Sequence, residues 1–222
     1  AFLVALVGLL WRELAAGNSW SHAPVGVAIS LYAAANITFH VLALSGAETD
    51  LAVRMALGLD MFLLTFIGGR LTPNFTREFL VGQAKRERPT PFSRFDGLSI
   101  ALVLMAALAW TVLPSAPATG WILVAAGGVN LARLLRWYGW LTWREPLVLS
   151  LHVGYGWLAL SMLVLGCALL GVGLAKEDAV HALTTGAVGA MTLAVMTRAS
   201  LGHTGRPRHA GPATVCIYVL VF

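Results

Sequence analysis

Residues 178–208 read DAVHALTTGAVGAMTLAVMTRASLGHTGRPR, and this stretch decides the class of fold. After Asp178 its first part is largely apolar, with His181 near its start, and a helix of roughly 20 such residues crosses the hydrocarbon core of a bilayer. The stretch then ends in a dense polar and basic run that contains Arg198, His203 and Arg206. An apolar helix with one imidazole near its start, and a second beside basic groups at its end, suggests metal or haem chemistry in a membrane.

The composition of the whole chain agrees with a membrane location. The chain has 222 residues, of which 58% are hydrophobic and 11% are charged, and its mean hydropathy is +0.78. A soluble domain usually has about 25% charged residues, so this chain lacks the polar residues needed to cover a water-facing surface. Because the apolar blocks are roughly 17–25 residues long, we expect an all-α fold, a polytopic transmembrane helical bundle.

Eight apolar segments can be separated along the chain. They cover residues 1–11, 24–45, 51–69, 97–114, 119–137, 147–171, 179–198 and 212–222. The first and last are too short to span a bilayer. We therefore expect residues 1–222 to form a single transmembrane domain, a fragment of a longer protein with about six complete spans and truncated helices at both ends.

The charged residues set the orientation. Lys and Arg collect at 70–95, 133–144 and 198–208, whereas the loops between these regions are acidic, mixed or uncharged. The positive-inside rule places the basic loops in the cytoplasm, and we interpret 70–95 as a long cytoplasmic basic loop. Topology thus explains the net charge of +5, and we expect the lipid bilayer, and no nucleic acid, as a partner.

Polar side chains within the spans are candidates for function, because ionisable groups at membrane depth are costly. Tyr32, Asn36 and His40 are spaced four residues apart, so they share one face of their helix. We expect this face to point into the bundle or a wet cavity, with Asn36 as a partner for the His40 ring. Alternatively, His40 only hydrogen-bonds between helices. Asp60 should be protonated or paired with a group on another helix, and could transfer a proton, support a histidine or pack as a neutral acid.

Depth limits which histidines can share a metal. His40 and His181 are expected near the outer face, His152 in the cytoplasmic half of its span and His203 in a cytoplasmic loop. His40 and His152 should differ by about 15 Å in depth and cannot bind one ion. The feasible pairs are His40 with His181, and His152 with His203. Either pair could hold haem or copper, because imidazole suits both.

Four stretches, in order, resemble the NnrS family of bacterial polytopic membrane proteins. They are NITFHVLAL around His40, IGGRLTPNFTREFL at 67–80, RWYGWLTWREPLVLSLHVGYGW at 136–157 and HALTTGAVGAMTLAVMTRASLGHTGRP at 181–207. The resemblance implies a helical bundle of the bacterial cytoplasmic (inner) membrane, associated with haem and copper and with protection from nitric oxide and nitrosative stress. The chain is similar to the C-terminal part of such proteins, so missing N-terminal helices of the same protein are an implied partner.

The family also implies roles for particular residues. The candidate cofactor ligands are His40, His152, His181 and His203, with Arg198, Arg206 and Arg70 as candidate partners of haem propionates. Simple positive-inside flanks are the alternative interpretation of these arginines.

Three classes of function fit these residues. The first is binding or redox handling of nitric oxide, or of a metal–nitrosyl species, at haem or copper. The second is a transporter or channel for protons, metal ions or small anions, lined by Asp60, Asn130 and the face that carries His40. A membrane scaffold for a partner oxidoreductase is a third. No catalytic acid–base set is evident in the sequence, so none of these classes assigns a catalytic residue.

Overall fold

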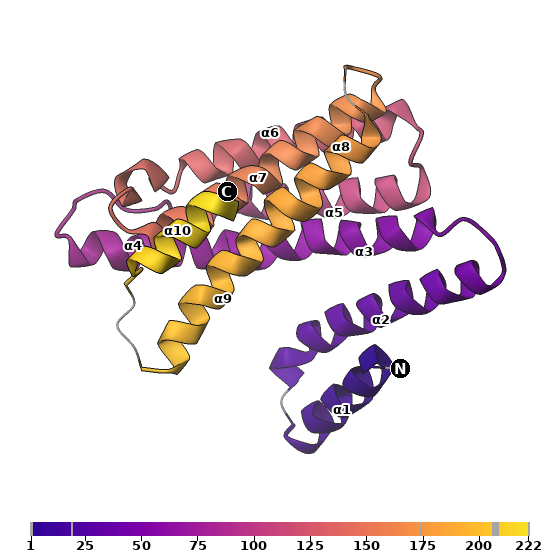
Figure 1. Cartoon of the computed structure of the whole chain (residues 1–222), viewed down its shortest axis with the longest axis horizontal. Coiled ribbons are helices and arrows are strands. Elements are labelled where there is room, and N and C mark those ends of the chain that lie inside the picture. The colour runs from indigo at the N-terminus through magenta and orange to yellow at the C-terminus, as the bar shows by residue number, and fades with distance from the viewer. Residues whose placement is uncertain (1, 19, 174, 206–208, 222) are drawn as a thin grey trace.

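The structure is a computed structural model that describes residues 2–18, 20–173, 175–205 and 209–221. Within these ranges it contains helices and no strand (Figure 1). This confirms the all-α fold. The elements are α1 (Phe2–Ala16), η1 (Trp20–His22), α2 (Ala23–Leu44), α3 (Asp50–Leu63), η2 (Leu64–Gly68), α4 (Gly69–Gly82), α5 (Arg94–Val112), α6 (Pro117–Leu135), η3 (Gly139–Thr142), α7 (Pro146–Leu169), α8 (Lys176–His181), η4 (Ala182–Gly189), α9 (Ala190–His203) and α10 (Pro212–Val221).

Within the described residues, six helices are long and apolar enough to cross a membrane. Four of them are α2, α5, α6 and α7. The other two are composite: α3, η2 and α4 run on as one helix over Asp50–Gly82, and α8, η4 and α9 do so over Lys176–His203. Each of these six overlaps one of the six longer apolar segments of the sequence, although the helix over Asp50–Gly82 extends beyond segment 51–69.

Helix α7 is the centre of the bundle. It packs against α6, α4, η4 and α9, and 61% of its apolar window is buried, compared with 11% for α2. Helices α1 and α2 form a hairpin that joins the other helices through α3 and leans away from them (Figure 1). The apolar surface of α2 is therefore largely uncovered by the rest of the chain.

Glycines allow the closest packing, between α6 and α7. A Cβ at Gly127 would lie 2.8 Å from the carbonyl oxygen of Ala159, and one at Gly166 would lie 2.7 Å from that of Gly120. Larger side chains would push the helices apart. Small residues are what lets helix backbones approach closely in lipid.

The basic loop expected over 70–95 begins later than expected, because α4 is helical to Gly82 despite an internal Pro73. Proline cannot donate to the carbonyl four residues earlier, which usually ends a helix. Here that carbonyl belongs to Gly69 and accepts a hydrogen bond from the Arg133 guanidinium at 3.3 Å. A tertiary contact thus replaces the missing helical bond, and the sequence of the segment alone could not show it.

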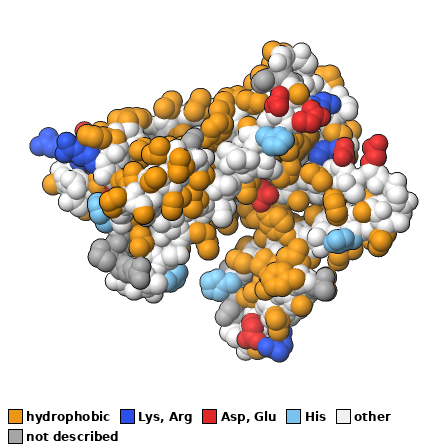
Figure 2. Space-filling model, viewed as in Figure 1, with side chains coloured by type: hydrophobic (Ala, Val, Ile, Leu, Met, Phe, Trp, Pro, Cys, Tyr) orange, Lys and Arg blue, Asp and Glu red, His pale blue; other side chains and the backbone are white. Residues whose placement is uncertain are grey.

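We call the end of the bundle where segments 83–93 and 136–145 lie the basic end. Lys and Arg side chains gather where α4 ends, and several acidic side chains gather at the opposite end (Figure 2). This distribution agrees with the alternation of charge along the sequence and with the basic end being cytoplasmic.

Candidate functional site

A completely buried arginine lies near the basic end. Arg133, close to the end of α6, has a side chain that is 0% exposed. Its Nε atom lies 2.8 Å from Oδ1 of Asp96, in the first turn of α5. Arg136 reaches the other carboxylate oxygen at 3.5 Å, and Ser93 donates to the same oxygen through its backbone N–H at 2.9 Å. Because a buried unpaired charge is strongly destabilising, Arg133 and Asp96 each stabilise the other in the folded protein.

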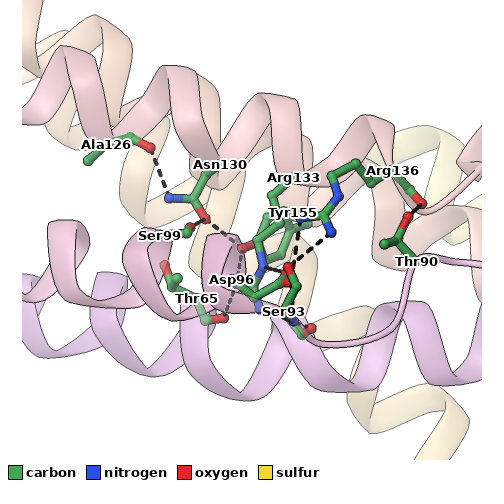
Figure 3. A network of polar contacts seen from close by, with 11 residues as sticks. Thr65, Thr90, Ser93, Asp96, Ser99, Ala126, Asn130, Arg133, Arg136 and Tyr155 are labelled. Atoms are coloured by element: carbon green, nitrogen blue, oxygen red, sulfur yellow. Dashed lines mark hydrogen bonds and ion pairs between the residues drawn. The ribbon is translucent and has the colours of Figure 1, made fainter.

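Further polar groups extend this ion pair across α5, α6 and α7 (Figure 3). Arg133 donates to the Tyr155 hydroxyl at 2.9 Å, and that hydroxyl donates to Oδ1 of Asn130 at 2.6 Å. Ser99 donates to the same oxygen at 2.9 Å, and the Asn130 amide donates to the carbonyl of Ala126 at 2.9 Å. Their polar groups are thus well satisfied. We call the set the Arg133 network; it comprises Ser93, Asp96, Ser99, Asn130, Arg133, Arg136 and Tyr155.

Arg133 also donates hydrogen bonds to the composite helix formed by α3, η2 and α4. Its guanidinium donates to the Thr65 carbonyl at 3.1 Å and to that of Gly69, both in or beside the π-helical turn η2. π-Helical turns disturb the regular helical hydrogen bonds and often occur at functional sites. A Cβ at Gly69 would lie 2.7 Å from Cζ of Arg133, and one at Gly68 would lie 2.6 Å from Cε of Met191. The two glycines of the IGGR stretch therefore make room for an arginine and a methionine.

His152 lies beside this network but is closely covered. It is buried, and its Nε2 lies 2.7 Å from the Thr76 hydroxyl. That hydroxyl donates to the Thr72 carbonyl at 2.8 Å, so it accepts from Nε2 and leaves Nδ1 as the bare nitrogen. Nδ1 is buried and has no hydrogen-bond partner among the described residues.

The surroundings of Nδ1 test whether His152 can hold a metal cofactor. A Cβ added to Gly139 would lie 2.5 Å from this nitrogen, and the Trp137 ring lies 6.5 Å from the imidazole centroid. A bound ion would need to sit about 2 Å from the nitrogen, where the backbone of Gly139 approaches. The residues present therefore do not fit a haem at His152. Its expected partner His203 is exposed at the end of α9.

His40 and His181 are both exposed, on different helices. The His40 ring packs edge-on against Phe39 at 5.8 Å, and Nδ1 of His181 lies 2.8 Å from the Glu177 carbonyl. Helix α2 packs on α1 and α3, whereas α8 packs on α7 and η4, and α3 lies between α2 and α8 in Figure 1. Both imidazoles are accessible to ligands. Within the described part of the chain, no three His, Cys, Asp or Glu side chains form a group that could hold a metal ion.

The three polar residues on one face of α2 have different environments. The Tyr32 hydroxyl donates to the carboxyl group of Asp60 on α3, so Asp60 does have a partner on another helix. Asn36 and His40, one and two turns further along α2, are exposed. The structure thus brings Tyr32 and Asp60 together and leaves the other two side chains on the uncovered surface of α2.

The three arginines singled out in the sequence have different environments. Arg198 is buried, lies 3.2 Å from Oε2 of Glu78 and packs over the Phe75 ring at 3.9 Å. Arg70 is exposed, with its guanidinium 4.4 Å from the centroid of Phe66. Arg206 lies outside the residues that the structure describes.

The Arg133 network is the feature that the sequence interpretation missed. Arg133 was read as a positive-inside flank, and Asp96 was not singled out. One signal was present: Asn130 and Arg133 are three residues apart in an apolar segment and therefore share a helix face. An asparagine and an arginine on one face of a spanning helix indicate an interior position.

Comparison with protein families gives a match over the whole chain. The family model described as NnrS protein matches residues 1–222. No curated protein and no solved structure matches the chain.

Proposed function

The chain belongs to the NnrS family, and we propose that it helps to form a haem- or copper-binding site that binds nitric oxide or handles it by redox chemistry. Membership makes it a membrane protein related to the nitric oxide response, and its six apolar helices agree with a multi-pass protein. The match over the whole chain is the observation that carries the proposal. We further propose the bacterial cytoplasmic membrane as its location.

His40 and His181 are the ligands that we propose. Imidazole is a common ligand of both haem iron and copper, and both side chains are exposed on spanning helices. When bound, the metal would supply a position for nitric oxide or a path for one electron. As the family resemblance implies, we propose that N-terminal helices of the same protein supply the remaining ligands.

The surroundings of these histidines support a site shared with other helices. Asn36 lies one turn from His40 on the exposed surface of α2, where it could orient the ring. Arg198 is engaged by Glu78, so binding a haem propionate would require it to exchange one carboxylate for another. Arg206 remains a proposed propionate partner.

The transport alternative is not carried by a specific observation. Its polar groups belong to different helix interfaces: Asp60 and Tyr32 lie between α2 and α3, whereas Asn130 lies in the Arg133 network. The side chain of Asn130 is fully buried, and both its oxygen and its amide nitrogen are bonded to protein atoms. These hydrogen bonds favour a structural role for Asn130 over a role in lining a transport path.

The test is the visible absorption spectrum and metal content of the full-length natural protein in detergent, after haem and copper loading. We expect a Soret band that weakens in His40→Ala or His181→Ala and shifts when nitric oxide is added. His22→Ala is the matched control, because His22 is also exposed but precedes α2 at its other end. A colourless, metal-free preparation after loading, or equal spectra in all three variants, would overturn the proposal.

A further inference from the structure

A cavity of about 310 Å³ lies at the basic end, beside the Arg133 network. One wall is a face of α4, and the others come from the segment before α5 and the segment after α6. The lining residues that matter here are Arg70, Asn74, Arg77, Phe92, Asp96 and Trp137.

The α4 wall carries two arginines that no carboxylate among the described residues neutralises. Arg70, Asn74 and Arg77 occupy positions i, i+4 and i+7 of the helix, so they share one face, and all three are exposed. Arg77 donates to the carbonyl of Pro89 at 3.3 Å, and Arg70 packs over Phe66. Among the described residues, neither arginine forms an ion pair with a carboxylate. Both charges therefore remain available to an anion in the cavity.

Asp96 is the one carboxylate among the lining residues, and its charge is already matched. Arg133 lies 2.8 Å from one of its oxygens and Arg136 lies 3.5 Å from the other. Four guanidinium groups lie in or beside the cavity, namely those of Arg70, Arg77, Arg133 and Arg136. With one carboxylate among them, three positive charges are in excess. An anion that enters meets a net positive field, and exposed arginine pairs suit phosphate oxygens particularly well.

The cavity lies at the level expected for lipid headgroups. Phe92 at its edge is 60% exposed, and Trp140 and Trp143, in and after η3, are 55% and 64% exposed. Element η3 packs against α4. Exposed tryptophans mark the interface between membrane and water, and basic pockets between spanning helices on the cytoplasmic side bind anionic headgroups.

We propose that this cavity binds a phosphate group between Arg70 and Arg77, carried by the headgroup of an anionic phospholipid. Free phosphate offers the same chemistry from the cytosol. The headgroup is favoured because two arginines that form no ion pair with a carboxylate among the described residues line the cavity, and exposed aromatic side chains line it or lie on the neighbouring segment. The site does not depend on haem, copper or any histidine.

Native mass spectrometry and thermal melting of the full chain in detergent, without added metal or haem, test this site. The probes are phosphatidylglycerol, phosphatidylcholine and inorganic phosphate. The variant is Arg70→Gln with Arg77→Gln. The control, Lys85→Gln with Arg86→Gln, removes the same charge from the same basic region but outside the cavity lining. Asn74→Asp places a negative charge in the cavity without removing an arginine, and it serves if the double variant does not fold.

Each Lys or Arg near an anionic headgroup strengthens binding about five-fold. Losing two of them should therefore weaken phosphatidylglycerol binding about 30-fold. We expect this loss of phosphatidylglycerol binding in the double variant, a loss in Asn74→Asp as well, and little change in the control. Binding of phosphatidylcholine should be the same in all of these proteins. Equal losses in the variant and the control would overturn the site, as would unchanged binding in the variant. Stabilisation by inorganic phosphate but not by phosphatidylglycerol would overturn the lipid as the source.

Discussion

Replacing Arg133 with methionine should destabilise the bundle more than removal of any other charge at the basic end. Methionine keeps most of the volume but removes the partner of Asp96 at 2.8 Å. It also removes the donors to the carbonyls of Thr65 and Gly69. The Gly69 carbonyl lacks the usual helical donor four residues later, because that residue is Pro73. The variant thus leaves the Asp96 charge and the Gly69 carbonyl without their arginine partner, whereas the Thr65 carbonyl keeps the backbone N–H of Gly69 as a donor.

The size of the effect follows from these losses. Breaking a buried ion pair by removing one partner costs about 3–5 kcal/mol, and a buried acceptor left without a donor costs about 1–3 kcal/mol. Arg136, 3.5 Å from the other oxygen of Asp96, offsets part of the loss. We therefore expect the free energy of unfolding to fall by about 4 kcal/mol. The matched variant, Arg136→Met, should cost about 1 kcal/mol or less, because its side chain is 26% exposed and its contacts are longer.

The assay is reversible unfolding in mixed micelles by titration with a denaturing detergent, followed by circular dichroism. Asp96→Asn, alone and combined with Arg133→Met, completes a double-mutant cycle. The double variant should lose clearly less stability than the sum of the single losses, since removing both charges leaves neither one buried alone. Equal losses for Arg133→Met and Arg136→Met, or strict additivity in the cycle, would refute the reasoning.

Other contacts give further expectations. Gly127→Val should destabilise the protein by about 2 kcal/mol or more, because its Cβ would lie 2.8 Å from a backbone oxygen of α7, whereas Gly128→Ala, with open space around its Cβ, should be nearly neutral in thermal melting. Tyr32→Phe should cost about 1–3 kcal/mol by removing the hydroxyl that donates to Asp60, and Asp60→Asn in the same protein should add less than its own separate cost. His152→Ala should lower stability by about 2–4 kcal/mol through a cavity and a lost hydrogen bond, without changing the spectrum of any haem that the protein binds. A spectral change in that last variant would contradict the fit derived for His152.

The fold class and the spans could be predicted from the sequence because each depends on one segment at a time. In hydrocarbon, a spanning helix must satisfy its backbone hydrogen bonds within itself, so length and polarity of a segment suffice to recognise it. The structure confirms the all-α fold, and the charge alternation agrees with the distribution of charged side chains over its two ends. The bounds of the expected loop over 70–95 differ from the structure, where α4 continues through Pro73 to Gly82.

The lateral arrangement of the helices was decided by tertiary structure alone. The depth of a residue follows from counting along its helix, but its neighbours depend on how each helix is rotated and on which helices are adjacent. Arg133 and Asp96 are 37 residues apart in sequence, and only the packing of α5 against α6 makes them one ion pair. For the same reason, equal expected depth could not establish that His40 and His181 meet: their helices pack on different neighbours. The sequence by itself determined which segments are helices and where along the membrane normal their polar groups lie. The contacts between those groups arise from close packing between helices, and the energy of such packing depends on residues that are distant in the chain.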